Sequence, residues 1–232
     1  MSKSTLLVIG AAGDVGQGIV EEALASGRQV IACGRNGEKL ERIAARHPGK
    51  PIACVVGDIA TESGASALWD EAAKAFGGID AVVVSVSATH KRQPLTEWSA
   101  ADLCASLASE IGLHFIAVKV LVPRLPESGL FIGLGGGTAD FIIPKMAHVS
   151  MSQAAQRMLY RGLARERRAG AEIRELMIVS MVNGESSRQH AKPEWLSDIE
   201  IGRHVCAILD APANFPGPIL QLKSREQVGH AE

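Results

Sequence analysis

Three glycines at a spacing of three follow a short apolar run near the start of the chain. The run covers residues 6–9, and the glycines are Gly10, Gly13 and Gly16. The run predicts a strand buried on both faces, and the apolar periodicity behind it predicts a helix from Asp14. Between them, the glycine turn leaves backbone N–H groups and the positive end of a helix dipole facing an open space. A Cβ there would hold a phosphate away, so the pattern predicts a dinucleotide site.

A basic residue follows the second predicted strand, in the sequence RQVIACGRNGEKL. Dinucleotide-binding units that prefer the unphosphorylated cofactor usually carry an acidic residue here, which binds the adenosine ribose. Arg35 can pair with a 2′-phosphate, so the sequence favours NADP(H) over NAD(H). The alternative is an arginine on a solvated turn. Asp58, after the third predicted strand, either accepts a hydrogen bond from the adenine amino group or caps the next helix.

Strand-like and helical patterns alternate along the whole chain. The predicted strands cover 5–9, 29–33, 52–57, 80–86, 129–134, 173–180 and 218–222. The predicted helices cover 14–26, 37–46, 62–76, 99–124, 147–168 and 199–210. The alternation predicts a Rossmann-like, doubly wound α/β fold with a seven-stranded, mostly parallel sheet and helices on both faces. Because no linker or repeat divides the chain, we expect a single NAD(P)-binding domain over residues 1–232.

Composition and charge indicate which binding partners and which cellular compartment to expect. The chain has 24 basic and 25 acidic residues and a net charge of -1, which favours neither nucleic acid nor an anionic membrane. We expect no metal site, because no histidine or carboxylate spacing matches one. No signal peptide is evident, and no apolar stretch approaches the roughly 18 residues of a membrane span. We expect a cytoplasmic protein with buried free thiols at Cys33, Cys54, Cys104 and Cys206.

The order of these motifs resembles the short-chain dehydrogenase/reductase family from residue 5 to about 222. GAAGDVG at 10–16 is similar to the family's glycine motif, and CGRN at 33–36 to the turn of its NADP-preferring members. GDI at 57–59 resembles the adenine-contacting segment, and VSVS at 84–87 stands where the family usually has Asn-Asn-Ala-Gly. Together, motifs and resemblance imply cofactor contacts at Gly10, Ala12, Gly13, Asp14, Val15, Gly16, Arg35, Asn36, Asp58, Ile59, Ser85, Val86 and Ser87.

The residues that move the proton in that family are absent from the matching positions. In the family a Tyr hydroxyl transfers the proton and a Lys four residues later lowers its pKa. A Ser thirteen residues before the Tyr orients the carbonyl, and an Asn on the preceding helix supports the Lys. The matching positions here, in the order Tyr, Lys, Ser, Asn, are Val149, Gln153, Gly136 and Glu110. Tyr160 is the only tyrosine, and its context predicts a helix interior or a subunit contact.

Other polar residues near the expected site could supply a proton. Glu110 and His114 share one predicted helix face, which gives a buried acid beside the nicotinamide. The alternatives are a structural Glu–His contact or a helix face that looks into a solvent-filled cleft. Lys145 and His148 lie just before the Tyr position, with a polar, exposed loop as the alternative. Thr138 offers a hydroxyl two residues past the Ser position.

The resemblance also implies a substrate lid at 183–198, with a plain surface loop as the alternative. It implies a homodimer or homotetramer formed through the predicted helices 99–124 and 147–168, unless their apolar faces are used in the chain's own core. We expect an NADP(H)-binding oxidoreductase that acts on a small carbonyl, alcohol or enone with a non-standard proton donor. The alternative is a catalytically silent dinucleotide-binding sensor or structural partner.

Overall fold

A parallel sheet runs through the centre of the computed structural model, which describes residues 4–87, 90–167 and 169–231. The strands, in the spatial order β3-β2-β1-β4-β5-β6-β9, are all parallel to their neighbours. Their bounds are β1 (Thr5–Ile9), β2 (Gln29–Gly34), β3 (Ile52–Val56), β4 (Ala81–Val84), β5 (Leu130–Gly136), β6 (Glu172–Ile178) and β9 (Ile219–Leu222). The predicted seven-stranded parallel sheet is confirmed.

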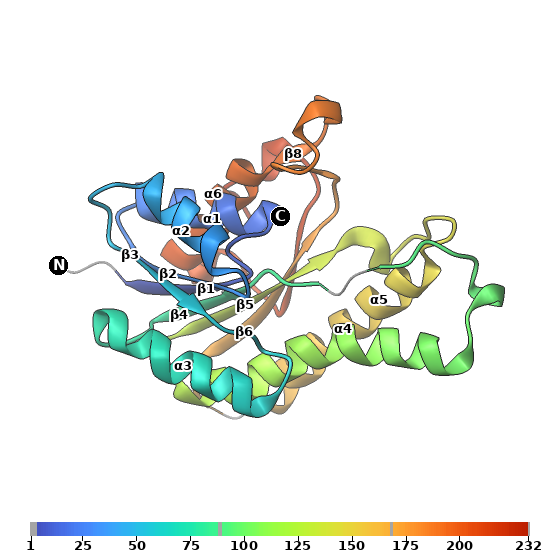
Figure 1. Cartoon of the computed structure of the whole chain (residues 1–232), viewed down its shortest axis with the longest axis horizontal. Coiled ribbons are helices and arrows are strands. Elements are labelled where there is room, and N and C mark those ends of the chain that lie inside the picture. The colour runs from blue at the N-terminus through green and yellow to red at the C-terminus, as the bar shows by residue number, and fades with distance from the viewer. Residues whose placement is uncertain (1–3, 88–89, 168, 232) are drawn as a thin grey trace.

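Helices cover both faces of this sheet (Figure 1). One layer contains α1 (Asp14–Ala25), α2 (Gly37–Ala45) and α6 (Asp198–Asp210). The other contains α3 (Glu62–Phe76), α4 (Ala100–Leu121) and α5 (Ala147–Glu166). Successive residues of a strand point to opposite faces, so Leu6 packs under the first layer and Leu7 under the second. Each layer therefore has its own apolar core, and the predicted doubly wound fold is confirmed.

The strand order reverses at the centre of the sheet. From β1 the chain moves outward to β2 and β3, then returns to β4 on the other side of β1 and continues outward to β9. The crossover helices therefore leave β1 and β4 in opposite directions, and doubly wound folds commonly bind their ligands at such a reversal. This is the place where the fold can bind a ligand.

Helices α1 and α6 approach each other closely enough for backbone contact. A Cβ on Gly18 would lie 2.1 Å from the Asp198 carbonyl oxygen, and one on Gly202 would lie 2.2 Å from the Gly18 carbonyl oxygen. The start of α6 is fixed by a capping box in which Ser197 and Glu200 bond each other's backbone N–H. This packing holds the segment before α6 above the start of α1.

A second, two-stranded sheet joins β7 (Val182–Asn183) to β8 (Leu196–Ser197). The sequence did not predict these strands, because two residues are too few to show a strand's alternation. The loop between them projects from the top of the molecule in Figure 1. The small sheet closes the base of the region for which a lid was expected.

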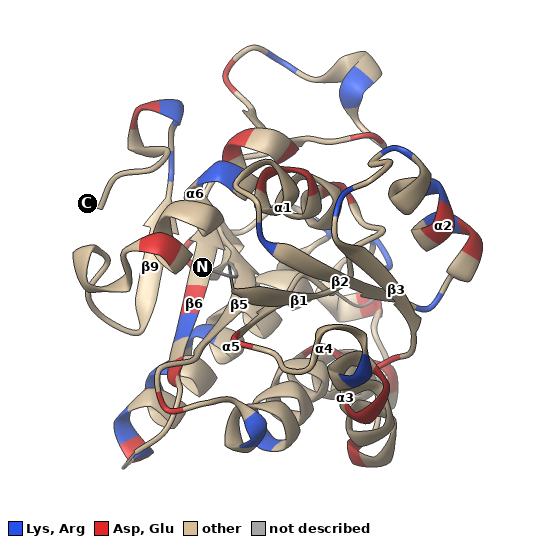
Figure 2. Ribbon diagram, turned by 90° about the vertical axis from the view of Figure 1, so that its left-hand side faces the viewer, with Lys and Arg blue, Asp and Glu red and all other residues tan. Residues whose placement is uncertain are grey.

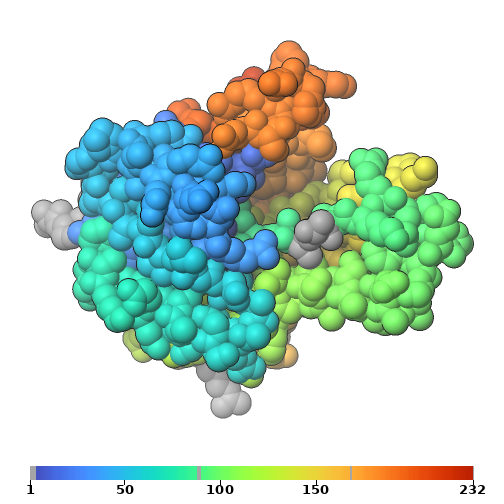
Figure 3. Space-filling view, in the orientation of Figure 1, coloured from blue at the N-terminus to red at the C-terminus, as the bar shows by residue number. Residues whose placement is uncertain are grey.

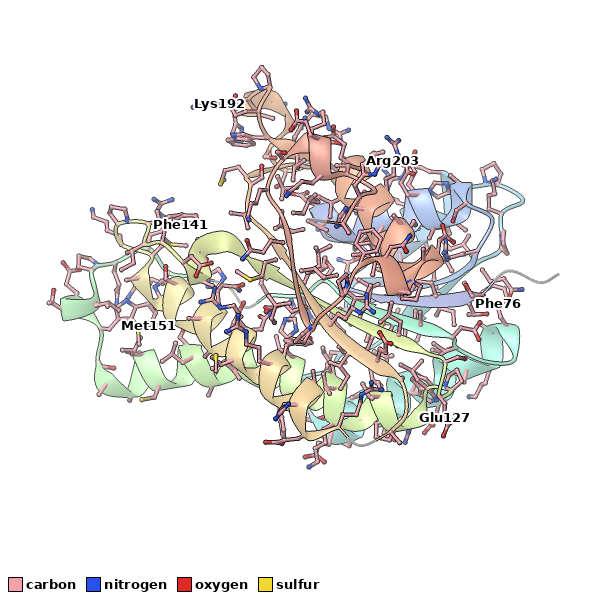
Figure 4. All side chains as sticks on the ribbon, turned by 180° about the vertical axis from the view of Figure 1, so that it is seen from behind. Phe76, Glu127, Phe141, Met151, Lys192 and Arg203 are labelled. Atoms are coloured by element: carbon pink, nitrogen blue, oxygen red, sulfur yellow. The ribbon has the colours of Figure 1, made fainter. Side chains whose placement is uncertain are left out.

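Helices α4 and α5 extend past the carboxyl ends of the strands (Figure 1). Figure 4 shows Met151 and Phe141 at this protruding end. By length and composition alone, the helical segment Ala100–Arg124 is long and apolar enough to cross a membrane. No such segment was predicted from the sequence. Five of the residues of α4 are buried against the rest of the chain, and two of them are Glu110 and His114.

The cysteines are free but not all buried. Cys33 and Cys206 are buried, and burial raises the pKa of the Cys33 thiol to about 12. Cys54 and Cys104 are exposed, so the expectation that all four are buried is wrong. Cys54 lies on β3, which is an edge strand. The position of β3 in the sheet, which the strand's sequence does not specify, decides that exposure.

Candidate functional site

The first four strands end at one edge of the sheet. Ile9, the last residue of β1, pairs with Cys33 of β2 and with Val84, the last residue of β4. Loops that follow parallel strands with aligned ends must meet at that edge. The structure thereby gathers the polar residues and the glycine that follow these strands, which are Gly10, Arg35, Asp58 and Ser85.

The turn after β1 requires glycine for two separate reasons. Gly10 has a φ of +87°, and a Cβ on it would lie 2.1 Å from the Ser85 carbonyl oxygen. A Cβ on Gly16 would lie 2.1 Å from the Gly10 carbonyl oxygen. Gly13 is the N-cap of α1, and no side chain caps this helix. The first N–H groups of α1 are therefore left for a ligand, and a pyrophosphate fits this bare helix end.

A cavity of about 840 Å³ lies beside this turn. Its walls are formed by Ala12, Gly13, Asp14, Gln17, Lys39, Arg42, Ile43, Arg46, Glu185 and Ser186. Lys39 and Arg42 come from α2, the helix labelled at the right of Figure 2, and Arg46 is its C-cap residue. The three basic residues recur at spacings of three and four, so they share one side of the helix. The sequence analysis missed them, although that helical spacing was visible after Arg35.

Part of the 183–198 segment lies against the start of α1. The Asp14 carboxylate accepts hydrogen bonds from the Ser186 backbone N–H, at 3.0 Å, and from the Ser186 hydroxyl. Gln17 Nε2 donates to Glu185 Oε2 at 2.8 Å. A Cβ on Gly184 would lie 2.3 Å from Asp14 Cβ, so the two backbones pack closely there. The predicted cofactor residue Asp14 therefore uses its side chain to hold this segment over the cavity.

Seen from outside, this segment forms one wall of a hollow. In Figure 3 the surface is hollowed between the orange 183–198 segment and the green and yellow lobe of α4 and α5. In the ribbon view of the same orientation, the carboxyl ends of the strands point toward the side from which α4 and α5 protrude (Figure 1). A ligand held at the turn after β1 can therefore extend along these strand ends toward β5.

Of the residues expected near the adenosine, Arg35 is exposed and forms no ion pair with any described residue. Asn36 is the N-cap of α2, and its side chain accepts a hydrogen bond from the Lys39 backbone N–H at 2.9 Å. The side-chain oxygen of Asn36 is therefore occupied by its own helix. Arg35 keeps its guanidinium available at the position where a 2′-phosphate was expected.

Asp58 makes a local turn contact, because its Oδ1 accepts a hydrogen bond from the Ala60 N–H at 2.9 Å. Thr61 is the N-cap of α3, so Asp58 does not cap that helix. Ile59 is buried in the core under α3. The second carboxylate oxygen of Asp58 has no hydrogen-bond partner among the described residues.

Residues 85–87 follow β4 and form the floor below the turn after β1. The Ser85 N–H donates to the Ile9 carbonyl at 2.8 Å, which extends the pairing of β1 and β4 by one step. Ser85 and Val86 are partly buried, and Ser87 is exposed. Val15, the remaining predicted contact, packs its side chain against the core of the first layer.

The positions that match the family's Ser and Lys contact each other. The Gly136 backbone N–H, at the end of β5, donates a hydrogen bond to Gln153 Oε1 on α5. A Cβ on Gly136 would lie 3.4 Å from this oxygen and 3.7 Å from the Thr138 hydroxyl. Val149, at the Tyr position, is partly buried one helical turn before Gln153. The structure thus brings these positions together, but Gly136, Val149 and Gln153 carry no group that titrates.

His114 is paired with Tyr160 on α5. Its Nδ1 lies 2.9 Å from the Tyr160 hydroxyl, and both side chains are buried. Burial lowers the pKa of His114 to about 4, an effect that a contact with the Val86 backbone partly offsets. Burial also raises the pKa of Tyr160 well above its usual value. Tyr160 is therefore a neutral core residue on α5, which confirms the helix interior as the one of the two predicted settings that applies.

His148 is enclosed by aromatic rings. Its ring centroid lies 4.7 Å from that of Trp98 and 5.8 Å from that of His90. Both ring nitrogens are buried without a hydrogen-bond partner among the described residues, and burial lowers the pKa of His148. Lys145 is exposed in a left-handed turn with a φ of 67°. His148 is therefore a neutral imidazole, and it is poorly suited to donate a proton.

A buried carboxyl that the sequence analysis did not single out lies between β5, β6 and α5. Glu175 has no exposed surface, and its Oε1 accepts a hydrogen bond from Gln156 Nε2 at 2.9 Å. A Cβ on Gly135 would lie 2.3 Å from that Oε1, so glycine makes room for the carboxyl. Burial raises the pKa of Glu175 to about 7. The only sequence signal was a charged residue inside an apolar strand.

Comparison with known proteins agrees with this geometry. A family model described as short chain dehydrogenase matches residues 4–183. A chloroplastic tropinone reductase homolog of Arabidopsis thaliana is 27% identical over 164 residues, which are 69% of this chain and 51% of that protein. A short chain dehydrogenase/reductase of Colletotrichum higginsianum is 25% identical over 146 residues, or 60% of this chain and 54% of that protein. The chain spans about half the length of these curated relatives.

Solved structures share the fold over nearly the whole chain. A short-chain dehydrogenase/reductase from Brucella melitensis superposes with a TM-score of 0.81 and 24% identity, covering 94% of both chains. An alcohol dehydrogenase from Thermococcus sibiricus, complexed with 5-hydroxy-NADP, gives a TM-score of 0.81 at 19% identity, covering 96% of this chain and 97% of that one. A short chain oxidoreductase from Pseudomonas aeruginosa, described as containing an atypical catalytic center, gives 0.81 at 18% identity, covering 94% and 95%.

Proposed function

This chain belongs to the short-chain dehydrogenase family, and we propose that it is an NADP(H)-dependent oxidoreductase for a small carbonyl, alcohol or enone substrate. The observation that carries the proposal is the start of α1, which no side chain caps and which lies beside a cavity, after a turn that Gly10, Gly13 and Gly16 make possible. The first N–H groups of the helix are left for a ligand there. These N–H groups would hold the pyrophosphate, and the nicotinamide would supply or accept the hydride.

Charge supports a preference for the phosphorylated cofactor. Arg35 is exposed after β2, and no acidic residue takes the place from which a ribose hydroxyl would be bound. Lys39, Arg42 and Arg46 add positive charge to the wall of the neighbouring cavity. A 2′-phosphate carries negative charge that this surface attracts and a carboxylate would repel.

The test is a fluorescence titration with NADPH and NADH. We expect NADPH to bind more tightly, and Arg35→Asp to reduce the preference by about 10- to 100-fold, because a hydrogen bond to a charged group contributes about 1.5–3 kcal/mol. Lys50→Asp is the matched control, because Lys50 is exposed just before the amino end of β3. The expected cofactor site lies at the carboxyl ends of the strands. A preference that Arg35→Asp leaves unchanged contradicts the assignment.

The proton must come from a source other than the family's tyrosine. Val149, Gln153 and Gly136 offer no titrating group, and the Tyr160 hydroxyl is enclosed in the core. We propose that water supplies the proton, and that buried Glu110 is the side chain whose contribution as a proton donor should be tested against water. Loss of a positioned general acid costs about 10²–10⁴ in rate, so a reactive substrate can still turn over.

The second candidate function is a dinucleotide-binding sensor or structural partner without turnover. The absent proton relay at positions 136, 149 and 153 favours it, while the glycine turn supports cofactor binding in either case. NADPH consumption over a panel of ketones, aldehydes and enones separates the two. Turnover with any of these substrates supports the enzyme, and bound cofactor with no turnover on the whole panel supports the sensor.

We also propose self-association through α4 and α5. Phe115, Met151 and Met158 on these helices are 42%, 41% and 60% exposed, which is unusual for such large apolar side chains. We expect a dimer or tetramer by light scattering, and a smaller species for Met158→Glu. Met181→Glu is the control, because Met181 is 57% exposed outside these helices. An unchanged mass for Met158→Glu would exclude this interface.

A further inference from the structure

The orientation of the Gln153 side-chain amide is fixed by its partner. The Gly136 backbone N–H can only donate a hydrogen bond, so the group facing it must be the Gln153 carbonyl oxygen and not the NH₂ group. Gln153 is only 8% exposed, and its Nε2 has no hydrogen-bond partner among the described residues. The structure therefore holds an unused N–H donor, directed away from Gly136.

The Gln153 N–H donor lies at the carboxyl ends of the strands. Gln153 lies on the second turn of α5, four residues after Val149, so both side chains share one side of the helix. Gly136 is the last residue of β5, and the Thr138 hydroxyl lies near it in the following turn. The Gln153 amide thus lies at the end of the edge that begins with the glycine turn of β1.

We propose that the Gln153 Nε2–H group binds a substrate oxygen on which negative charge develops, and that the site therefore takes conjugated enones in preference to simple ketones. This inference rests on the proposed NADP(H)-dependent function. An amide N–H stabilises an oxyanion by hydrogen bonding but keeps its proton at neutral pH. The side chain is therefore suited to a reaction in which no side chain has to protonate the oxygen.

Enone reduction meets this condition. Bound NADPH would supply one hydride, which would form a C–H bond at the β carbon while the electron pair of the C=C bond moves to form a double bond between the α carbon and the carbonyl carbon. The carbonyl π pair moves onto oxygen, and the Gln153 N–H stabilises the resulting enolate. Water then gives a proton to the α carbon and leaves hydroxide, so the products are the saturated ketone and NADP⁺.

Reduction of a simple ketone would place the whole charge on an alkoxide oxygen. An alkoxide is a far stronger base than an enolate, whose charge is shared with carbon, so it depends on a proton delivered to oxygen. Val149 and Gly136 cannot deliver one. The same geometry therefore supports one substrate class and disfavours the other.

The first test uses NMR and needs no turnover. The side-chain amide of Gln153 is followed in ¹⁵N-labelled protein saturated with NADP⁺ while ionised 4-nitrophenolate, an enolate mimic, is added. We expect a downfield shift of one Gln153 amide proton, with no shift for Gln156. Gln156 is the internal control, because both its donors are used in the core, by the Leu134 carbonyl and by Glu175.

Two variants make the test specific. Gln153→Glu keeps an oxygen for the Gly136 N–H but replaces the donor with a second, charged oxygen. Gln153→Leu removes both groups. We expect each to weaken phenolate binding by about tenfold or more and to lower the rate with 2-cyclohexen-1-one by about 10²-fold or more, while the NADPH affinity stays within about threefold. Circular dichroism melting of both variants shows whether they are folded.

The outcomes separate this inference from the proposed function. If the parent protein does not bind NADPH, the proposed function fails. If NADPH binds but the Gln153 amide responds to NADP⁺ alone and not to phenolate, the amide serves the cofactor and the inference is overturned. Faster reduction of cyclohexanone than of 2-cyclohexen-1-one, or phenolate binding that Gln153→Glu leaves unchanged, also overturns it.

Discussion

Replacing Glu175 with glutamine removes one buried ionisable group and keeps its shape. Glu175 lies on β6 with no exposed surface, and Gln156 Nε2 donates to its Oε1 at 2.9 Å. The Oε2 atom has no hydrogen-bond partner among the described residues. Burial raises the pKa of Glu175 to about 7, although Gln156, Arg157 and Arg161 each act to lower it. A glutamine amide resembles the protonated acid, so Glu175→Gln isolates the effect of ionisation.

The direction of the pH effect follows from where the proton binds more tightly. The ordinary pKa of this carboxyl is 4.5, and folding raises it to about 7, so the folded state holds the proton more tightly than the unfolded state does. The stability from this group is complete below about pH 4.5 and is lost as the pH rises through about 7. At about 1.4 kcal/mol per pKa unit, the loss is roughly 3 kcal/mol.

Other buried groups act in the opposite direction, so the parent protein alone cannot show this effect. The pKa of His114 falls from 6.5 to about 4 on folding, and its contribution therefore grows as the pH rises between those values. The measured quantity is the difference in unfolding free energy between the parent and Glu175→Gln, from urea denaturation at pH 5 and pH 8. In that difference the contribution of His114 cancels.

We expect the advantage of the parent over Glu175→Gln to shrink by about 2–3 kcal/mol between pH 5 and pH 8. Glu127→Gln is the control for losing one negative charge, because Glu127 is exposed in the turn before β5 (Figure 4). A difference that stays constant between the two pH values would mean that Glu175 is already ionised in the folded protein. That result would refute the argument from burial.

Two further predictions concern contacts between distant parts of the chain. Tyr160→Phe removes the hydroxyl that lies 2.9 Å from His114 Nδ1, and we expect a loss of about 1–3 kcal/mol in unfolding free energy by urea denaturation, because a buried ring nitrogen is left without its partner. A loss below about 0.5 kcal/mol would contradict this. Asp14→Ala removes the acceptor of both Ser186 hydrogen bonds, and we expect limited proteolysis to cut within 183–198 several times faster, with unchanged cleavage elsewhere. Equal rates in the parent and the variant would show that these bonds do not hold the segment.

The fold could be predicted from local patterns. Short apolar runs such as residues 6–9 alternate with helical spacings, and this fixes a parallel sheet with crossover helices. The glycine turn was predictable because the close approaches that require it involve nearby backbone. Gly16 approaches the Gly10 carbonyl, and Gly10 approaches the Ser85 carbonyl just after the neighbouring strand. The absence of a tyrosine, lysine and serine from the matching positions was also plain, because it depends on residue identity alone.

The partners of the site residues were decided by the tertiary structure. Helical spacing placed Glu110 and His114 on one side of α4, but the packing of α5 gave His114 to Tyr160, 46 residues away. Asp14 and Ser186 are separated by 172 residues, and their contact depends on the packing of α6 against α1. Residue spacing specifies the side of an element on which a residue lies. It does not specify which other element lies opposite.

The orientation of the Gln153 side-chain amide was also decided by the tertiary structure. In the sequence it is an uncharged residue where a lysine was expected, which indicates only a lost function. The structure places the Gly136 N–H against its oxygen, and that contact fixes which end of the amide remains available. Residue identity showed that a proton relay is absent. Only the approach of β5 to α5 determined that a hydrogen-bond donor stands in its place, because the direction of a hydrogen bond is set by the group it meets.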